Sequence, residues 1–368
     1  MIKSARLAAL VLLIMPIVAA CGRNTGSAGP PSLRSIYASR LSLSDVTPVV
    51  GDAENWWPAA PTFDVPPLNS ATRDEANPVG LVVRFAHLGT AEMLEFRYQV
   101  WVDTSIATNI EDFQQTVFGT PLTGPAAGDK ALYYNRKLQV GAAPFTNVAY
   151  LRVGQTTAIV VWSHIDGYAS TKTFGHLAVK TANRLKDALA GKLHPPSPEP
   201  TDTLLLPPAT TQLTLLGTTH LPLQVLPGIL SQPGPTGLMS DLKRLGATDL
   251  VFGDYTLDLD TRMEVQTVGI AFGTQGTGGE DWIAGFFAGG LSSTGEFSQY
   301  FAGLGIYMYG FGVGPRAVVM VCKSSNDGEE AGRSCEASMG LVVGAWHPHR
   351  SLTRLEEPPP LACETFAE

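Results

Sequence analysis

The chain has 368 residues, of which 44% are hydrophobic, and its 25 basic and 33 acidic residues give a net charge of −8. This length and hydrophobic content are ample for buried cores and favour two domains. The acidic balance repels phosphate backbones, so nucleic acid is not expected as a partner.

The first twenty residues have the pattern of a secretory signal. A short cationic start containing Lys3 and Arg6 precedes an apolar run that ends in small residues. The run is shorter than a comfortable bilayer span, and Pro16 interrupts it. We therefore expect residues 1–20 to be removed as a signal peptide.

The signal ends in Val18-Ala19-Ala20-Cys21, which resembles the lipobox of bacterial lipoproteins. The resemblance implies cleavage before Cys21 and acyl chains, such as palmitate, on that cysteine. It further implies a mature protein on the extracytoplasmic face of the cell membrane, anchored through its N-terminal lipid. The alternative is an ordinary signal peptide followed by an unrelated cysteine.

Residues 21–70 are rich in Gly, Pro, Ser and Asn and show no sustained period of two or 3.6. This composition predicts a flexible tether that lifts the folded part off the membrane. The adjacent Trp56 and Trp57 are unusual in a free linker. We expect them to dock on the folded body, with the lipid headgroup layer as the alternative location.

An internal repeat predicts two related domains. Residues 78–104 align without gaps with residues 235–261, and the first identities are Pro78 with Pro235, Gly80 with Gly237 and Leu81 with Leu238. Each copy has apolar residues at helical spacing, then a glycine, then period-two alternation. The pattern predicts a short helix that turns into a strand, once in each copy.

A second match in the same order strengthens the repeat. Val153-Gly154 precedes the apolar run 158–161, and Val313-Gly314 precedes the similar run 317–320. Both predict a tight turn that leads into a buried strand. After this block the first copy ends in an amphipathic helix over 171–189, whereas the second has a glycine-rich segment and an expected strand over 338–346.

The predicted fold class is α+β, with two tandem related domains that are each an antiparallel sheet packed against helices. The expected order is the signal peptide, the tether, a first domain over 71–193, a Pro-rich linker over 194–209, a second domain over 210–355 and a C-terminal tail over 356–368.

The remaining cysteines predict one disulfide in the oxidising exterior. Cys322 and Cys335 are expected to pair and to close the polar loop 323–334 between two predicted strands. Closing such a loop contributes about 3 kcal/mol by restricting the unfolded chain. A zinc site is the alternative, although Cys322, Cys335 and Cys363 lack close pairing and a fourth ligand nearby. Cys363 stays unassigned.

The glycine-rich segment 273–279 follows a predicted strand and precedes a helix-like stretch, an order that can cradle phosphate. Here Glu280 and Asp281 occupy the place of a phosphate, and two carboxylates suit the helix dipole by themselves. Gly310, Gly312 and Gly314 are followed by β-like residues and indicate a bent strand or turn. No cofactor is therefore expected.

Three further groups of residues have metal-ligand or catalytic chemistry, and each has a simpler explanation. His347 and His349 are expected at a strand end, and the acids Asp254, Asp258, Asp260 and Glu264 on the wet face of a hairpin. Ser163, His164 and Asp166 are of the types used in hydrolases, but adjacency in the chain does not aim side chains at one another. We expect no metal ligands and no catalytic residues.

The stretch 128–189 resembles the small α+β sensor-like domains of bacterial envelope lipoproteins, which implies extracytoplasmic binding and assigns no residue a role. The leading hypothesis is a non-enzymatic, lipid-anchored envelope protein whose paired domains bind an unknown ligand or protein. The second is a structural or assembly role in the envelope. The third, a hydrolase, needs convergent His, Ser or carboxylate side chains.

Overall fold

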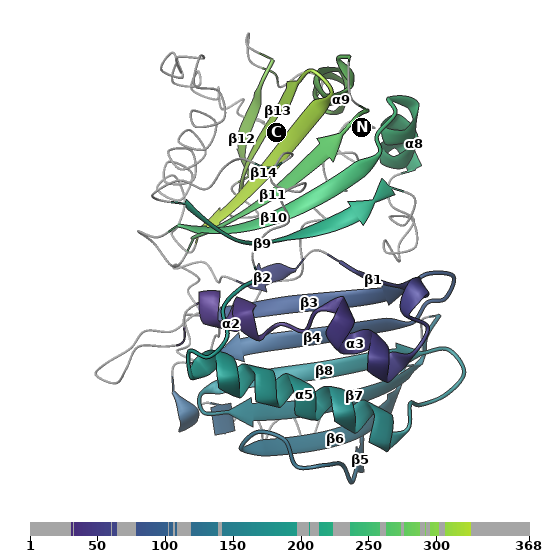
Figure 1. Ribbon diagram of the computed structural model, residues 1–368, viewed down its shortest axis with the longest axis vertical. Helices are drawn as coiled ribbons and strands as arrows, with labels where there is room; N and C mark the ends of the chain where they lie inside the picture. Colours follow the sequence, from purple (N-terminus) through teal and green to yellow (C-terminus); the bar gives the residue numbers. More distant parts are fainter. Residues whose placement is uncertain are drawn as a thin grey trace, which may run out of the picture.

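The computed structural model of the protein has two antiparallel β-sheets with helices packed against them (Figure 1). The structure describes residues 31, 33–59, 61–64, 79–101, 103–105, 107–108, 119–138, 142–196, 206, 213–223, 236–257, 263–273, 276–287, 291, 295–301 and 306–324.

The first sheet has eight strands in the order β1-β3-β4-β8-β7-β6-β5, and β2 also pairs with β3. All of these pairings are antiparallel. The strands are β1 Trp56–Pro58, β2 Thr62–Asp64, β3 Val79–His87, β4 Met93–Val100, β5 Thr120–Leu122, β6 Lys130–Lys137, β7 Phe145–Val153 and β8 Thr156–His164.

One face of the first sheet is covered by the helices α2 (Leu33–Ser39), α3 (Leu43–Val50) and α5 (Thr171–Leu189) (Figure 1). The predicted helix over 171–189 is confirmed. It begins where the Ser170 hydroxyl accepts the Thr173 backbone N–H at 3.1 Å. Its buried stripe, which includes Phe174, Leu177 and Leu185, packs in the same core as Phe85 of the sheet.

The tether prediction is wrong over residues 33–64, where α2, α3, the 3-10 turn η1 (Ala53–Asn55), β1 and β2 belong to the folded body. Ile36, Tyr37 and Val46 have no exposed surface and join the core of the first sheet. The predicted docking of the tryptophans is confirmed for Trp56, which is only 2% exposed. Burial of a few apolar side chains, rather than composition, decides the structure of this segment.

The second sheet has the order β12-β13-β14-β11-β10-β9, again with antiparallel pairings. Side chains of α8 and α9 pack in its core together with Leu250 and Val319. Its elements are β9 Leu213–Pro222, α8 Thr236–Arg244, β10 Asp249–Leu257, β11 Met263–Ala271, α9 Gly278–Phe286, β12 Phe297–Phe301, β13 Ile306–Val313 and β14 Arg316–Ser324.

The structure corrects the first block of the predicted repeat. Residues 236–244 form the expected helix α8, but the matching residues 79–87 form the strand β3. The helical spacing of Leu81, Phe85 and Leu88 was misleading because β3 is buried on both faces: Leu81, Val82 and Val83 are each at most 2% exposed. A strand of this kind loses the period-two alternation that would identify it.

The strand orders of the two sheets correspond in another way. The path β3-β4-β8-β7-β6 of the first sheet has the same connectivity and direction as β10-β11-β14-β13-β12 of the second. In both paths the last hairpin turns at a glycine with positive φ, Gly154 at 57° and Gly314 at 56°. The second block of the predicted repeat, a tight turn that leads into a buried strand, is therefore confirmed.

The two sheets meet where α2 lies against β9. The Tyr37 hydroxyl donates a 2.9 Å hydrogen bond to Oδ2 of Asp254 on β10, and both residues have no exposed surface. Leu216 of β9 packs in the core of the first sheet. At Gly217 even a Cβ atom would lie 2.8 Å from the Tyr37 hydroxyl oxygen. Helix α2 therefore joins the two sheets through a close-packed, buried contact.

Candidate functional site

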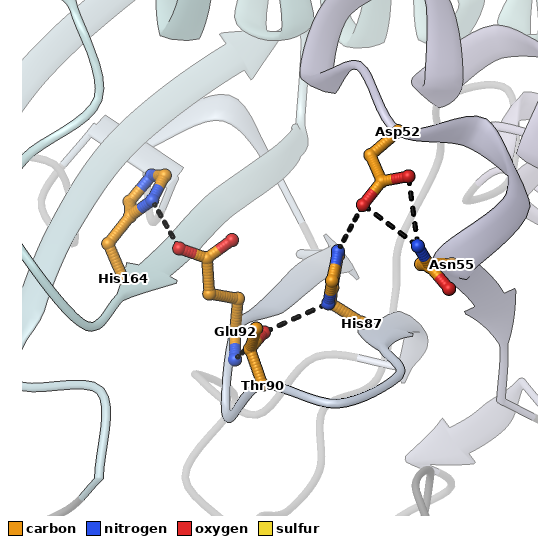
Figure 2. Close-up of polar contacts among 6 residues, drawn as sticks. All are labelled: Asp52, Asn55, His87, Thr90, Glu92 and His164. Carbon is orange, nitrogen blue, oxygen red and sulfur yellow. Dashed lines mark hydrogen bonds and ion pairs between the residues drawn. The ribbon is translucent and has the colours of Figure 1, made fainter.

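Six polar side chains gather at one end of the first sheet (Figure 2). Phe85, Leu94 and Trp162 point into the helix-covered core, so the residues two positions away, His87, Glu92 and His164, lie on the same face. The antiparallel register builds this site. His87 ends β3, its backbone N–H donates to the Glu92 carbonyl oxygen at 3.1 Å, and the β4–β8 register continues from Glu92 to His164. We call Asp52, Asn55, His87, Thr90, Glu92 and His164 the rim cluster.

His87 lies between a carboxylate and a hydroxyl. Its Nε2 is 3.0 Å from Oδ2 of Asp52, and its Nδ1 is 3.0 Å from the Thr90 hydroxyl oxygen. Because an ionised carboxylate only accepts, these partners place the ring proton on Nε2 and let the Thr90 hydroxyl donate to Nδ1. The ring also meets the edge of Trp56 at a centroid distance of 5.3 Å, which fixes its orientation.

Asp52 is oriented by its own loop. Nδ2 of Asn55 donates to both carboxylate oxygens at 2.9 and 3.0 Å. These hydrogen bonds, followed by the contact with His87, lower the pKa of Asp52 below its ordinary value. Asp52 also has a left-handed backbone, with φ of 48°, which directs the carboxylate toward the end of β3. The cluster thus contains a fixed, ionised carboxylate at neutral pH.

A second imidazole–carboxylate pair lies on the neighbouring strands. Nδ1 of His164 is 3.2 Å from Oε1 of Glu92, and the ring lies against Trp162 at a centroid distance of 4.4 Å. Nε2 of His164 is buried without a hydrogen-bond partner in the described structure. In both pairs the imidazole is the more enclosed member: the His87 and His164 side chains are 12% and 14% exposed, against 54% for Asp52 and 25% for Glu92.

The structure separates the three residues of hydrolase type at the end of β8. Ser163 and His164 are consecutive strand residues, so their side chains project to opposite faces of the sheet. His164 directs Nδ1 at Glu92 rather than at Asp166, which is exposed beyond the strand. A different line of groups, Thr90–His87–Asp52, has the order hydroxyl, imidazole and carboxylate.

The glycine-rich loop before α9 does not leave its helix terminus open. The backbone N–H of Gly279 donates to the Gly314 carbonyl oxygen at 2.9 Å, and the Glu280 carboxylate accepts the Gly314 N–H at 2.9 Å. The β13–β14 turn therefore occupies the place where a phosphate would bind. The prediction of a strand or turn at Gly310, Gly312 and Gly314 is confirmed, since Gly310 and Gly312 lie in β13 and Gly314 lies in the turn that follows it.

Other predicted site residues lie partly outside the described residues. Cys322 is buried in β14 and disulfide-bonded. Its expected partner Cys335 is not described, so that pairing stays a prediction. The prediction that Asp254 lies on the wet face of a hairpin is wrong, because the residue has no exposed surface and accepts a hydrogen bond from Tyr37 in the contact between the sheets. The residues of the earlier predictions that the structure does not describe are Cys21, Asp258, Asp260, His347, His349 and Cys363.

Within the described part of the chain, no three His, Cys, Asp or Glu side chains are grouped so that they could hold a metal ion. None of the described helices has the length and apolar character of a membrane span.

No protein-family model matches the chain, and no curated protein matches its sequence.

Proposed function

We propose that the protein is a non-enzymatic envelope lipoprotein, held on the extracytoplasmic face of a membrane by acyl chains on Cys21, which binds a ligand or partner through its paired domains. The rim cluster carries the binding part of this proposal. The Asp52 carboxylate lies at the surface and that of Glu92 is partly exposed, while enclosed histidines and Asn55 hold them in place. Fixed surface carboxylates suit a ligand with cationic or hydrogen-bond-donor groups, because little side-chain order is lost on binding.

The pairing of the domains has separate support. The shared strand order of the two sheets favours a duplication, with the correspondence running through β3 and β10. The buried contacts of Tyr37 with Asp254 and of Leu216 with the first core favour a pair that acts as one unit. The rim cluster belongs to the first sheet alone, so we propose that the second sheet holds the first sheet in place.

A hydrolase is the second candidate because Thr90, His87 and Asp52 form a line of hydroxyl, imidazole and carboxylate. The Thr90 oxygen also accepts the Glu92 backbone N–H at 3.2 Å, which is an ordinary turn contact. The contact of Thr90 is thus explained without a catalytic role, and a binding role requires fewer groups of the cluster than hydrolysis does. Turnover of a chromogenic ester that is abolished by Thr90→Val and Asp52→Asn would favour the hydrolase.

The binding role can be tested by photocrosslinking in an intact bacterial envelope. A benzophenone side chain replaces exposed Thr90 in the full-length precursor, or Lys172 on α5 as the matched exposed control. We expect a discrete adduct at Thr90 that is absent at Lys172 and lost in an Asp52→Asn, Glu92→Gln background. The protein is expected in the membrane fraction, and Cys21→Ala is expected to release it.

Each other outcome has a definite meaning. Adducts at Thr90 that persist without the two carboxylates would favour the structural or assembly role, because contact would then not depend on the rim chemistry. An absence of adducts, or equal adducts at both positions, would contradict the binding role. Membrane retention of the Cys21→Ala chain would contradict the lipid anchor.

A further inference from the structure

The face of the first sheet opposite the helices carries a buried carboxylate between two arginines. Phe85 and Phe96 point into the helix-covered core, so the alternate residues Arg84, Glu95 and Arg97 point to the other face. Arg84 is the direct cross-strand partner of Glu95, and Arg97 follows Glu95 by two positions on β4. All three side chains therefore lie together on one surface.

Glu95 binds the Nε atom of each arginine, with a different carboxylate oxygen for each. Its Oε2 accepts Nε–H of Arg84 at 2.6 Å, and its Oε1 accepts Nε–H of Arg97. The Glu95 side chain is only 8% exposed, so both of its oxygens are engaged inside the protein. A guanidinium has five N–H donors, and each of the two arginines uses one of them, its Nε–H, to bond to Glu95. No described residue accepts a hydrogen bond from the Nη atoms of either arginine.

The surroundings leave a positive charge on this face. Two guanidinium groups face one carboxylate, and their side chains are 27% exposed for Arg84 and 48% exposed for Arg97. The cross-strand neighbours of Arg97 are Val82 and Ile159, and Val161 lies beside Glu95 on β8. None of these neighbours carries a charge, so none of them neutralises the one positive charge that remains.

We propose that the Nη edges of Arg84 and Arg97 bind a phosphate group at this face. The Nε bonds to Glu95 hold both planar forks in place, which reduces the order lost on binding. A phosphate has more terminal oxygens than a carboxylate and can accept from both forks at once. This site lies on the opposite face from the carboxylates of the rim cluster. The phosphate proposal and the function proposed above are therefore independent, and failure of one does not contradict the other.

Thermal unfolding of the mature chain in neutral detergent tests the site. Inorganic phosphate is titrated at constant ionic strength against chloride. We expect a saturable rise in the unfolding midpoint, as for any ligand that binds only the folded state. Arg97→Gln and the charge-conserving Arg97→Lys should each raise the apparent dissociation constant by about 10-fold or more, because both remove the fork. Arg136→Gln, an equal charge change at an exposed site on β6, should leave it unchanged.

A second titration distinguishes free phosphate from a lipid headgroup. Dibutyryl phosphatidylglycerol, a short-chain anionic lipid, is compared with neutral dibutyryl phosphatidylcholine. A saturable, Arg97-dependent shift of the unfolding midpoint with phosphate alone indicates a soluble phosphate ligand. Such a shift with a lower apparent dissociation constant for the anionic lipid indicates a lipid headgroup. No saturable shift with either probe, or an equal loss in Arg136→Gln, overturns the proposal. Retained affinity in Arg97→Lys overturns the role of the fork.

Discussion

Single side chains connect segments that are distant in the chain, and Asp45 is the clearest case. Its carboxylate accepts the Ser42 backbone N–H at 2.9 Å, pairs with Nζ of Lys180 at 2.9 Å and lies 3.5 Å from Nη1 of Arg184. Burial alone would raise the pKa of Asp45, but the Ser42 hydrogen bond and the two cations lower it below its ordinary value. One residue thus fixes the start of α3 against α5.

The lowered pKa predicts how Asp45 contributes to stability as pH changes. The native state binds this proton less tightly than the unfolded chain, so the contribution is fully present above the ordinary pKa of 3.8 and is lost as pH falls through the lowered pKa of the folded state. We expect Asp45→Asn to lower the unfolding free energy by about 1 kcal/mol at pH 7. The difference from wild type, measured by urea denaturation, should shrink as pH falls from 7 to 3.

An exposed ion pair gives the control for that series. Asp187 pairs with Lys192, and both side chains are more than 40% exposed. Asp187→Asn should therefore change stability little at either pH. A loss in Asp45→Asn that stays constant between pH 7 and pH 3 would show that the lost group acts through packing or capping rather than through its charge.

Among the helices and strands, sequence periodicity predicts the type of an element correctly where one of its faces is buried, and fails elsewhere. Helix α5 has its predicted bounds because its stripe from Phe174 to Leu185 repeats at 3.6 residues. Strand β3 has a helix-like spacing of apolar residues because both of its faces are buried. Helices α2 and α3 have seven and eight residues, too short to be stable alone, so packing rather than propensity forms them.

The glycines around α9 serve close packing. A Cβ atom at Gly279 would lie 2.1 Å from the Arg316 carbonyl oxygen, and one at Gly312 would lie 2.5 Å from Cα of Glu280. The first turn of α9 therefore touches the backbone of β13 and β14 directly. A phosphate loop and a helix packed on a hairpin both require glycine, so the sequence alone could not distinguish them.

This packing predicts opposite effects for two alanine substitutions in the same helix. Gly279→Ala should destabilise by about 3 kcal/mol or more, because the new methyl group meets backbone that cannot move aside cheaply. Gly285→Ala should stabilise by about 0.5–1 kcal/mol, since nothing lies within 4 Å of the new Cβ and alanine favours the helix. Urea denaturation of both variants measures the difference, and similar stabilities would refute the close approach.

At the scale of the whole molecule, the sequence indicated two related parts but could not indicate how they meet. The rim cluster draws on His87, Glu92 and His164, which the strand register brings together, and on Asp52 from the loop before η1. The linear order displays none of these pairs, and the chain neighbours of His164 are not its partners in the fold. The contact between the sheets likewise depends on Tyr37, which lies in a segment whose composition is that of a linker.

The contact between α2 and β9 predicts that damage on one sheet is felt by the other. Leu216 belongs to β9 of the second sheet, yet it is 1% exposed in the core of the first. Leu216→Ala should cost about 2–5 kcal/mol, as for other buried leucines. Native-state hydrogen exchange should show faster exchange of the α2 and α5 amides, because a cavity opens beside the helices of the first sheet.

Leu250→Ala is the matched control, since Leu250 is 4% exposed and packs within the core of the second sheet. Its cavity should accelerate exchange in β10 and β11 more than in α2. If α2 and α5 exchange equally in the two variants, Leu216 is not a specific link and the sheets respond only through global unfolding. Faster exchange in α2 for Leu216→Ala alone would show that β9 completes the first core, so that the two sheets fold as one structural unit.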